Sequence, residues 1–351
     1  MLYTARVSDA ENGSAAPTPP TMADVARLAG VSKMTVSRAL GGGAVSADTR
    51  ARVLRAVDDV GYVPDAVAGA LSSGRSGFVA ALVPTLANSN FADTVRGLSD
   101  RLGAAGLQVL LGYTDYAPER EEAVVRAVLR HRPRAVVLTG GEHTDGTRVL
   151  LVRSQVPVVE TWDLPRTPLG LVVGFSNAAA CGQMVRHLAE RGYTRIGFIG
   201  GASGPGVRDL RGHDRRRGYL RAMSALRLGP PRVVDHGLPP VGPAHGAAAV
   251  ALLMERWPDT NAVVCVSDLA AMGALTECHR RGWAVPGRVA VAGFGDFELA
   301  ASCWPALTTV SVDPRGIGER TATLLLDALR GAPAEVVRVS TPVRIVPRDS
   351  T

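Results

Sequence analysis

Hydrophobic residues follow two different patterns along the chain, and the pattern changes near residue 76. Before that point, three short segments place apolar residues at the three- and four-residue spacing of amphipathic helices. The first segment begins after Thr21 and ends at Gly30, and the other two span 33–40 and 47–60. Serines precede the second and third segments, and glycines follow all three, as helix caps do. We therefore predict three short helices at the front of the chain.

From residue 78 onward, short apolar runs alternate with amphipathic segments. The apolar runs are 78–83, 109–111, 135–138, 156–159, 171–173, 196–199, 262–266 and 289–292, with a last strand at 343–346. The helix-like segments are 91–105, 119–131, 178–191, 215–225, 245–257, 269–281 and 315–329. Apolar strands separated by helices are typical of parallel sheets covered on both faces. A pause at 165–170 indicates two doubly wound α/β lobes, with a ligand cleft where strand ends face each other.

Composition narrows the class of protein. A length of 351 residues favours two or three domains, and 46% hydrophobic residues is ordinary for a globular protein. No apolar run is long enough to span a membrane, and residues 1–20 are polar, so we expect a disordered tail, no membrane partner and a cytoplasmic location. The four cysteines form no C-x-x-C pair and H-E-x-x-H is absent, so we expect neither a metal nor a cofactor.

Positive charge is concentrated in the helical front segment. The whole chain carries a formal charge of +7, and residues 21–56 hold six basic and two acidic residues. Three short helices with a glycine turn between the first two form the helix-turn-helix arrangement, whose second helix enters the DNA major groove. Val36 and Leu40 must then face the first helix, which leaves Lys33 and Met34 at the exposed start of the second. The alternative is a small helical cap on an enzyme.

Three sequence stretches at this end carry a resemblance to a known family. They are DVARLAGVSKMTVSRAL at 24–40, VSADTR at 45–50 and GYVP at 61–64, and together they resemble the head of the LacI/GalR family of bacterial transcription regulators. The resemblance implies that Lys33 and Met34 read bases and that Arg38 makes a further groove contact. It also implies phosphate contacts by Ser32, Thr35 and Ser37. We count Thr21, at the first helix start, among the expected DNA contacts. The DNA-binding domain is expected at 21–63.

Residues 64–75 are expected to form a hinge. In the family this stretch becomes a short helix on operator DNA, where a leucine matched by Leu71 wedges into the central minor-groove step. Asp65 and Gly69 depart from the family pattern, because an acid would lie near phosphate and a glycine weakens a helix. The alternative is a plain flexible linker.

The remainder, 76–351, resembles the family's effector-binding core, which is similar to periplasmic sugar-binding proteins. The resemblance implies three crossings of the chain between the lobes. We place lobe one at 76–174 and 297–330, and lobe two at 175–296 and 331–351.

Residues at strand ends are the candidates for effector binding. Asn90 and Phe91 follow the first strand of the core and match a ligand-contacting pair of the family; an amide suits hydroxyl groups, and a ring can stack on a sugar. Arg215 matches the arginine of the family's R-x-x-G-[FWY] motif, with a solvent-exposed helix arginine as the alternative. Asp268 matches an acid that grips hydroxyls, with a helix N-cap as the rival or additional role.

Four further polar residues are weaker candidates. Glu160 and Asp163 end one strand, although the family's ligand-contacting acid aligns nearer Trp162. Glu142 and His143 follow the strand at 135–138. Of these we retain only Glu160 as an expected effector contact.

The predicted function is a ligand-controlled, homodimeric repressor of a near-palindromic operator. Stretches such as KMTVSR at 33–38 and PVVETWD at 157–163 resemble the gluconate-operon repressors, which implies gluconate or a related aldonate as the effector. Arg215 could bind its carboxylate in a forked geometry. The alternatives are a regulator of a neutral sugar or other metabolite, a solute-binding protein, which the helix-turn-helix argues against, and a sugar-acid-converting enzyme. No G-x-S-x-G elbow or P-loop supports the enzyme.

Overall fold

The structure is a computed structural model that describes residues 19–41, 43–63, 76–331 and 337–351. The chain divides into two compact units, 1–74 and 75–351. Most of the expected tail and all of the expected hinge, with Asp65, Gly69 and Leu71, lie outside the described residues. Among the helices that are described, none is long and apolar enough to cross a membrane.

The described part of the first unit, residues 19–41 and 43–63, contains three short helices whose bounds are the predicted ones. They are α1 (Met22–Ala29), α2 (Lys33–Leu40) and α3 (Ala47–Val60). Each of α2 and α3 begins at a serine whose hydroxyl accepts a backbone N–H, and the glycine after α1 has a φ of 64°, which favours a residue without a Cβ. Val25, Val36 and Val53, one from each helix, are completely buried and form the centre of its small core.

The second unit contains two six-stranded sheets, which confirms the predicted pair of α/β lobes. The first sheet has the order β11-β5-β4-β3-β1-β2 and the second β12-β10-β9-β8-β6-β7. The strands of the first are β1 (Phe78–Val83), β2 (Gln108–Tyr113), β3 (Val136–Thr139), β4 (Val158–Thr161), β5 (Leu171–Gly174) and β11 (Arg338–Ser340). Those of the second are β6 (Ile196–Gly200), β7 (Arg232–Asp235), β8 (Ala262–Cys265), β9 (Ala290–Gly295), β10 (Thr308–Ser311) and β12 (Arg344–Val346). All pairings are parallel except β10 with β12.

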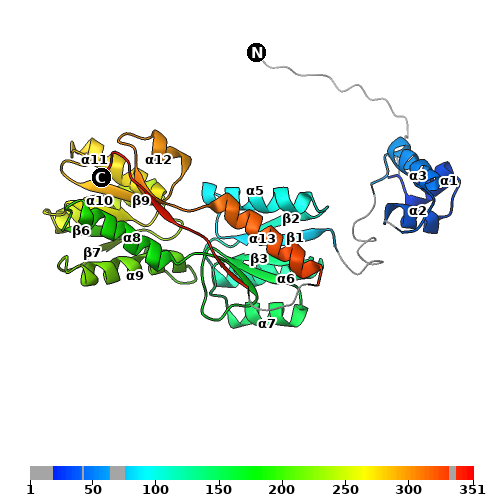
Figure 1. The fold of residues 1–351 in the computed structure, drawn as a ribbon, viewed down its shortest axis with the longest axis horizontal. Helices are drawn as coiled ribbons and strands as arrows, with labels where there is room; N and C mark the ends of the chain where they lie inside the picture. Colours follow the sequence, from blue (N-terminus) through cyan, green and yellow to red (C-terminus); the bar gives the residue numbers. More distant parts are fainter. Residues whose placement is uncertain (1–18, 42, 64–75, 332–336) are drawn as a thin grey trace, which may run out of the picture. The chain divides into compact units, whose positions relative to one another are not determined.

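Helices flank both sheets (Figure 1). Those that follow strands of the first sheet, lobe one, are α5 (Ser89–Gly103), α6 (Pro118–Leu129) and α7 (Asp145–Ser154), and α13 (Pro314–Leu329) joins them. Those of lobe two are α8 (Asn177–Glu190), α9 (Leu210–Ala225), α10 (Pro243–Arg256), α11 (Asp268–Arg280) and α12 (Glu298–Ser302). The sequence pattern missed β7, β10, β11, α7 and α12.

The lobe boundaries expected near the C-terminus are wrong in two places. β10 pairs with β9 and therefore belongs to lobe two, although 297–330 was assigned to lobe one. β11 pairs with β5 and belongs to lobe one, although 331–351 was assigned to lobe two. The chain thus crosses after β5, between β10 and α13, and between β11 and β12. β10 has the sequence TTVS and β11 only three residues, so neither forms the apolar run by which buried strands are recognised.

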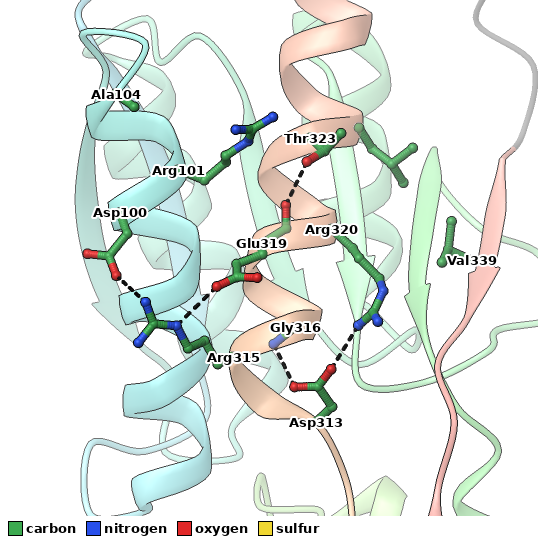
Figure 2. A pocket seen from close by; sticks show the side chains of 11 residues that line it. Asp100, Arg101, Ala104, Asp313, Arg315, Gly316, Glu319, Arg320, Thr323 and Val339 are labelled. Atoms are coloured by element: carbon green, nitrogen blue, oxygen red, sulfur yellow. Dashed lines mark hydrogen bonds and ion pairs between the residues drawn. The ribbon is translucent and has the colours of Figure 1, made fainter.

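α5 and α13 pack closely against each other on lobe one (Figure 1). A Cβ at Gly97 would lie 2.3 Å from the Arg315 carbonyl oxygen, and one at Gly318 would lie 2.0 Å from that of Thr94. Figure 2 shows the open groove along this helix pair, where Arg315 pairs with Asp100 at 3.1 Å and with Glu319 at 3.0 Å. These side chains are about half exposed, so the glycine contacts, rather than the ion pairs, fix the helix spacing.

Candidate functional site

The first unit exposes the side chains expected to contact DNA. Lys33, Met34 and Arg38 are exposed on α2, whereas Val36 and Ala39 are buried against α1 and α3. Met34 is 64% exposed at the first turn of the helix, beside Lys33. The surface of α2 therefore has the polarity and position that a major-groove recognition helix requires.

Three hydroxyl residues near these helix starts already have partners within the unit. Ser32 Oγ accepts a hydrogen bond from the Thr35 backbone N at 3.1 Å and lies 2.9 Å from its hydroxyl. The Asp24 carboxylate accepts hydrogen bonds from the Thr21 hydroxyl at 2.7 Å and the Thr21 backbone N at 3.0 Å. The Thr21 hydroxyl and Arg27 lower the pKa of Asp24 to about 2. These hydrogen bonds fix the starts of α1 and α2. Thr21 and Ser32 nevertheless remain exposed to solvent.

The second unit has a cavity of about 320 Å³ between its lobes, within the size range of small-ligand pockets. Lobe one lines it with Thr85, Asn88, Asn90, Phe91, Tyr116 and Trp162, and lobe two with Asp209, Arg211, Arg215, Ser267, Phe294 and Phe297 among others. The predicted cleft at facing strand ends is therefore present.

Asn90 and Phe91 lie in the cavity wall as expected. The N-terminal turn of α5 presents both, with Asn88 as the N-cap that accepts the Asn90 backbone N–H at 3.0 Å. Asn90 Nδ2 donates to the Gly295 carbonyl of lobe two at 3.0 Å, so this amide links the lobes. Phe91 packs edge-on against Trp162, with 5.2 Å between the ring centroids.

Arg215 also lines the cavity and is fixed from three sides. Its Nε donates to Asn177 Oδ1 at 2.9 Å, its Nη1 donates to the Val266 carbonyl at 2.7 Å, and its Cζ lies 3.7 Å from the Phe294 ring centroid. Burial lowers its pKa to about 10, so the guanidinium remains charged at neutral pH. Within the described part of the chain no carboxylate forms an ion pair with it. A half-buried cation with no ion-pair partner among the described residues favours an anionic ligand.

Arg211 is a second guanidinium in the cavity lining, at a position that is not among the predicted effector contacts. Its Cζ lies 5.4 Å from the Phe91 ring centroid and 5.9 Å from that of Tyr116, and its Nη1 donates to the Thr139 carbonyl of lobe one at 3.3 Å. The predicted helix began at 215, whereas α9 begins at Leu210. The spacing in the sequence indicates Arg211, because residues four apart share a helix face and Arg211 precedes Arg215 by four.

Glu160 is not part of the cavity, which corrects one expected effector contact. Its side chain is completely buried, Oε2 accepts the Leu169 backbone N–H at 2.7 Å, and Oε1 lies 3.3 Å from His143 Nε2. His143 Nδ1 in turn lies 2.6 Å from Glu121 Oε1. Burial opposes the charge on His143, but the two carboxylates outweigh it and raise its pKa to about 9. A strand alternates its faces, and this one directs Glu160 into the interior of lobe one.

The other weak candidates do not reach the main cavity either. Glu142 and Asp163 line a neighbouring cavity of only about 50 Å³, and His143 belongs to the buried cluster just described. Trp162, where the family's acid aligns, does line the main cavity.

Asp268 is also not among the cavity-lining residues, contrary to the expected effector contact, because its carboxylate lies behind the cavity wall. The residue is completely buried, and it accepts hydrogen bonds from the Phe297 backbone N at 2.7 Å and from Thr309 Oγ1 at 2.6 Å. Its neighbours Ser267 and Leu269 line the cavity instead. The rival N-cap role belongs to Ser267, whose hydroxyl accepts the Ala270 N–H at 3.3 Å.

Comparisons with known proteins agree with both units. Residues 21–65 match the family described as bacterial regulatory proteins, lacI family, and residues 185–351 match the periplasmic binding protein-like domain. The chain is 34% identical over 333 residues to the HTH-type transcriptional regulator GntR of Pseudomonas aeruginosa, covering 95% of this chain and 96% of that one.

Solved structures of transcriptional regulators also match most of this chain. A lacI-family transcriptional regulator from Silicibacter pomeroyi matches with a TM-score of 0.85 and 34% identity, covering 95% of this chain and 99% of the other. The transcriptional regulator CelR in complex with cellobiose matches with a TM-score of 0.70 and 29% identity, covering 95% and 100%.

Proposed function

This chain belongs to the lacI family of bacterial regulatory proteins and is a DNA-binding transcriptional regulator, and we propose that a small sugar acid such as gluconate releases it, as a repressor, from operator DNA. The related proteins are transcription regulators, so the alternative of a sugar-converting enzyme has no support. The solute-binding alternative fails on the helix-turn-helix unit.

The observation that carries the effector proposal is the pair of guanidiniums in one small cavity. Arg211 and Arg215 both line it, and Asp209 is the one acidic side chain among the described residues of its lining, so their charges sum to +1. A sugar acid offers a carboxylate to the guanidiniums and hydroxyl groups to polar neighbours such as Asn90 and Ser267. The aromatic rings of Phe91 and Trp162 suit the C–H faces of its carbon chain.

Ligand screening tests this proposal directly. Gluconate should raise the melting temperature of the full-length protein more than equal concentrations of glucose or cellobiose, because a ligand that binds only the folded state stabilises it by mass action. Gluconate should also release the protein from a DNA fragment that the protein itself selects from random sequence. If a neutral sugar stabilises and gluconate does not, the sugar-acid proposal is wrong.

The second candidate, a neutral sugar, rests on the cellobiose complex of CelR. A disaccharide needs more space than a single aldonate, and the volume of about 320 Å³ favours the smaller ligand. The same screen distinguishes the two.

For DNA we propose base contacts by Lys33, Met34 and Arg38 and phosphate contacts by Thr21, Ser32, Thr35 and Ser37. The exposure of Lys33, Met34 and Arg38 on α2 supports the base contacts. Thr21 and Ser32 are also exposed, whereas Thr35 and Ser37 are half-buried on the same unit. Lys33→Ala should relax sequence preference, whereas Ser37→Ala should weaken binding to all sequences alike; electrophoretic mobility shifts with specific and scrambled DNA separate the two effects.

We also propose the hinge at 64–75, with Leu71 as a minor-groove wedge. Leu71→Ala should reduce specific operator affinity and leave non-specific, salt-dependent binding unchanged, because the wedge acts only at the central step. Equal loss of both affinities would make the segment a passive tether.

A further inference from the structure

One turn of lobe two, residues 294–297, forms part of the effector cavity and touches several distant parts of the chain. It connects β9 to α12, and Phe294, Gly295 and Phe297 line the cavity. Phe294 lies directly under the Arg215 guanidinium, with 3.7 Å between Cζ and the ring centroid. The conformation of this turn therefore sets the position of the cation that we assign to the effector carboxylate.

The turn has a conformation that needs outside support. Gly295 has a φ of 132° and Asp296 a φ of 57°, both in the region that residues with a Cβ rarely adopt. Four side chains outside the turn bind it. The Asp268 carboxylate accepts the Phe297 N–H at 2.7 Å and Arg348 pairs with Asp296 at 2.7 Å. Thr309 Oγ1 accepts the Asp296 N–H at 3.4 Å, and Asn90 of lobe one binds the Gly295 carbonyl. Among the described residues, Asp268 is the carboxylate that accepts a backbone N–H of the turn, and its bond is shorter than the one that Thr309 accepts.

The residues around Asp268 leave room for its carboxylate and bind it. A Cβ on Gly293 would lie 2.1 Å from Asp268 Oδ1, so the glycine leaves room for it. Thr309, on β10, donates its hydroxyl to the same oxygen at 2.6 Å. One carboxylate thus connects the start of α11, the turn and β10.

The same turn is also a point of contact between the lobes. Asn90 of lobe one donates its Nδ2 hydrogen to the Gly295 carbonyl at 3.0 Å. A Cβ on Gly295 would lie 2.9 Å from that nitrogen, so the contact depends on glycine at this position. Any change in the turn that moves the Gly295 carbonyl alters an interlobe hydrogen bond.

We propose that Asp268 is a positioning residue for effector binding, which fixes the turn at 294–297 so that Phe294 supports Arg215 and the Gly295 carbonyl meets Asn90 of lobe one. Asp268 touches no effector in this arrangement and acts through the turn. The inference rests on the proposed function only for the identity of the effector, since the contacts of the turn exist without one.

The chemistry of Asp268 adds a pH response to this role. Burial raises its pKa to about 6, and the charge of Asp296 adds to the rise, while hydrogen bonds from Thr309 and Phe297 and the charge of Arg348 oppose it. The remaining ionisable groups facing it are the thiols of Cys265 and Cys303, whose pKa values are raised by burial and which stay neutral. Protonation places a hydrogen on one carboxyl oxygen and weakens its acceptance from Phe297 N–H or Thr309.

The first test uses ligand-free full-length protein. Amide hydrogen exchange should show the Phe297 N–H protected in the wild type and at least about ten-fold less protected in Asp268→Ala, since a hydrogen bond to a charged acceptor is lost. Asp259→Ala, which removes an acid of the same lobe that pairs with Arg232 away from the cavity, is the matched control and should leave Phe297 unchanged. Unchanged protection in a folded Asp268→Ala protein overturns the positioning role.

The second test measures gluconate affinity by calorimetry between pH 5 and pH 7.5. Wild-type affinity should fall as pH decreases through about 6, while Asp268→Asn, which resembles the protonated carboxyl and cannot titrate, should bind more weakly than the wild type at pH 7.5 and show no such fall. Thr309→Val removes a hydrogen bond that lowers the pKa of Asp268, so it should move the fall to higher pH, and it serves if the Asp268 variants fail to fold. An identical pH profile in Asp268→Asn overturns the proposal. If wild type binds no gluconate at any pH, the proposed effector is wrong, and the exchange experiment decides the positioning role by itself.

Discussion

Single side chains in the cavity divide into those that can contact an effector and those that support the wall. Arg215 belongs to the first group because it lines the cavity. Its Nε and Nη1 are bonded to protein groups, which hold the guanidinium in place. Glu160 and Asp268 belong to the second, although their sequence positions at strand ends look equivalent. The difference depends on which backbone N–H groups a carboxylate meets after folding, and no local pattern records that.

The first residue-scale prediction concerns Arg215. Arg215→Ala should abolish the response to a sugar acid and leave operator affinity intact, because truncating one partner of a buried charge pair typically costs about 2–5 kcal/mol. Calorimetry with gluconate measures the loss. Arg216→Ala is the matched control, since Arg216 is adjacent, pairs with Asp235 and is not among the cavity-lining residues. Equal effects of the two changes would refute the role of Arg215.

The second residue-scale prediction concerns the pH dependence of stability that His143 causes. Because its pKa is raised above the unfolded value to about 9, its favourable contribution to the free energy of unfolding is fully present below about pH 6.5 and is lost as pH rises through 9. The wild type should lose up to about 3 kcal/mol of stability relative to His143→Gln across that window. Urea denaturation at pH 6, 8 and 10 provides the comparison, and parallel pH curves for the two proteins would contradict it.

At the scale of elements, the pairing of α5 with α13 depends on glycine. Gly318→Ala should lower stability by about 1–3 kcal/mol, since its Cβ would meet the Thr94 carbonyl oxygen at 2.0 Å and force the helices apart. Gly103→Ala, at the end of α5 with no atom within 4 Å of its added Cβ, is the matched control and should be neutral or slightly stabilising. Thermal denaturation monitored by circular dichroism distinguishes the two variants.

Elements with strong periodic patterns could be predicted from the sequence, and the others could not. The bounds of α1, α2 and α3 follow from the sequence because a threonine or serine precedes each helix and a glycine follows it. α9 was begun five residues late because Gly212 and a run of arginines hide its first turn, and this delay concealed Arg211. β10 and β11 are edge or crossover strands with polar residues, so their lobe membership followed from pairing that the sequence pattern does not contain.

For the whole molecule we predict a homodimer on a near-palindromic operator, because a single three-helix unit has too small a footprint for a specific site. Leu110, Leu111 and Tyr113 are each more than 40% exposed on the edge strand β2, and Trp304 is 85% exposed in lobe two, which suits a second copy as partner. Sedimentation at micromolar concentration should give a dimer, and Leu111→Glu should favour the monomer. Operator affinity should fall steeply with salt as counterions are released.

A monomeric wild type bound to half-site DNA would contradict this prediction. Trp304→Ser on the other lobe provides a second substitution, which should weaken the dimer without altering the effector cavity, because Trp304 is not in its lining.

The close packing of α5 on α13 has a mechanical consequence. α5 carries Asn90 and Phe91 at its first turn and contains 15 residues, so it is about 22 Å long. Because the glycine contacts bring the two helices into close backbone contact, we expect the pair to move as one stiff body with Asn90 and Phe91 at its cavity end. If an incoming ligand tilts α5 by about 10° about Asn90, the other end of the helix, near Gly103, moves by about 4 Å. A ligand small enough for this cavity could thereby move structure well beyond its own contacts.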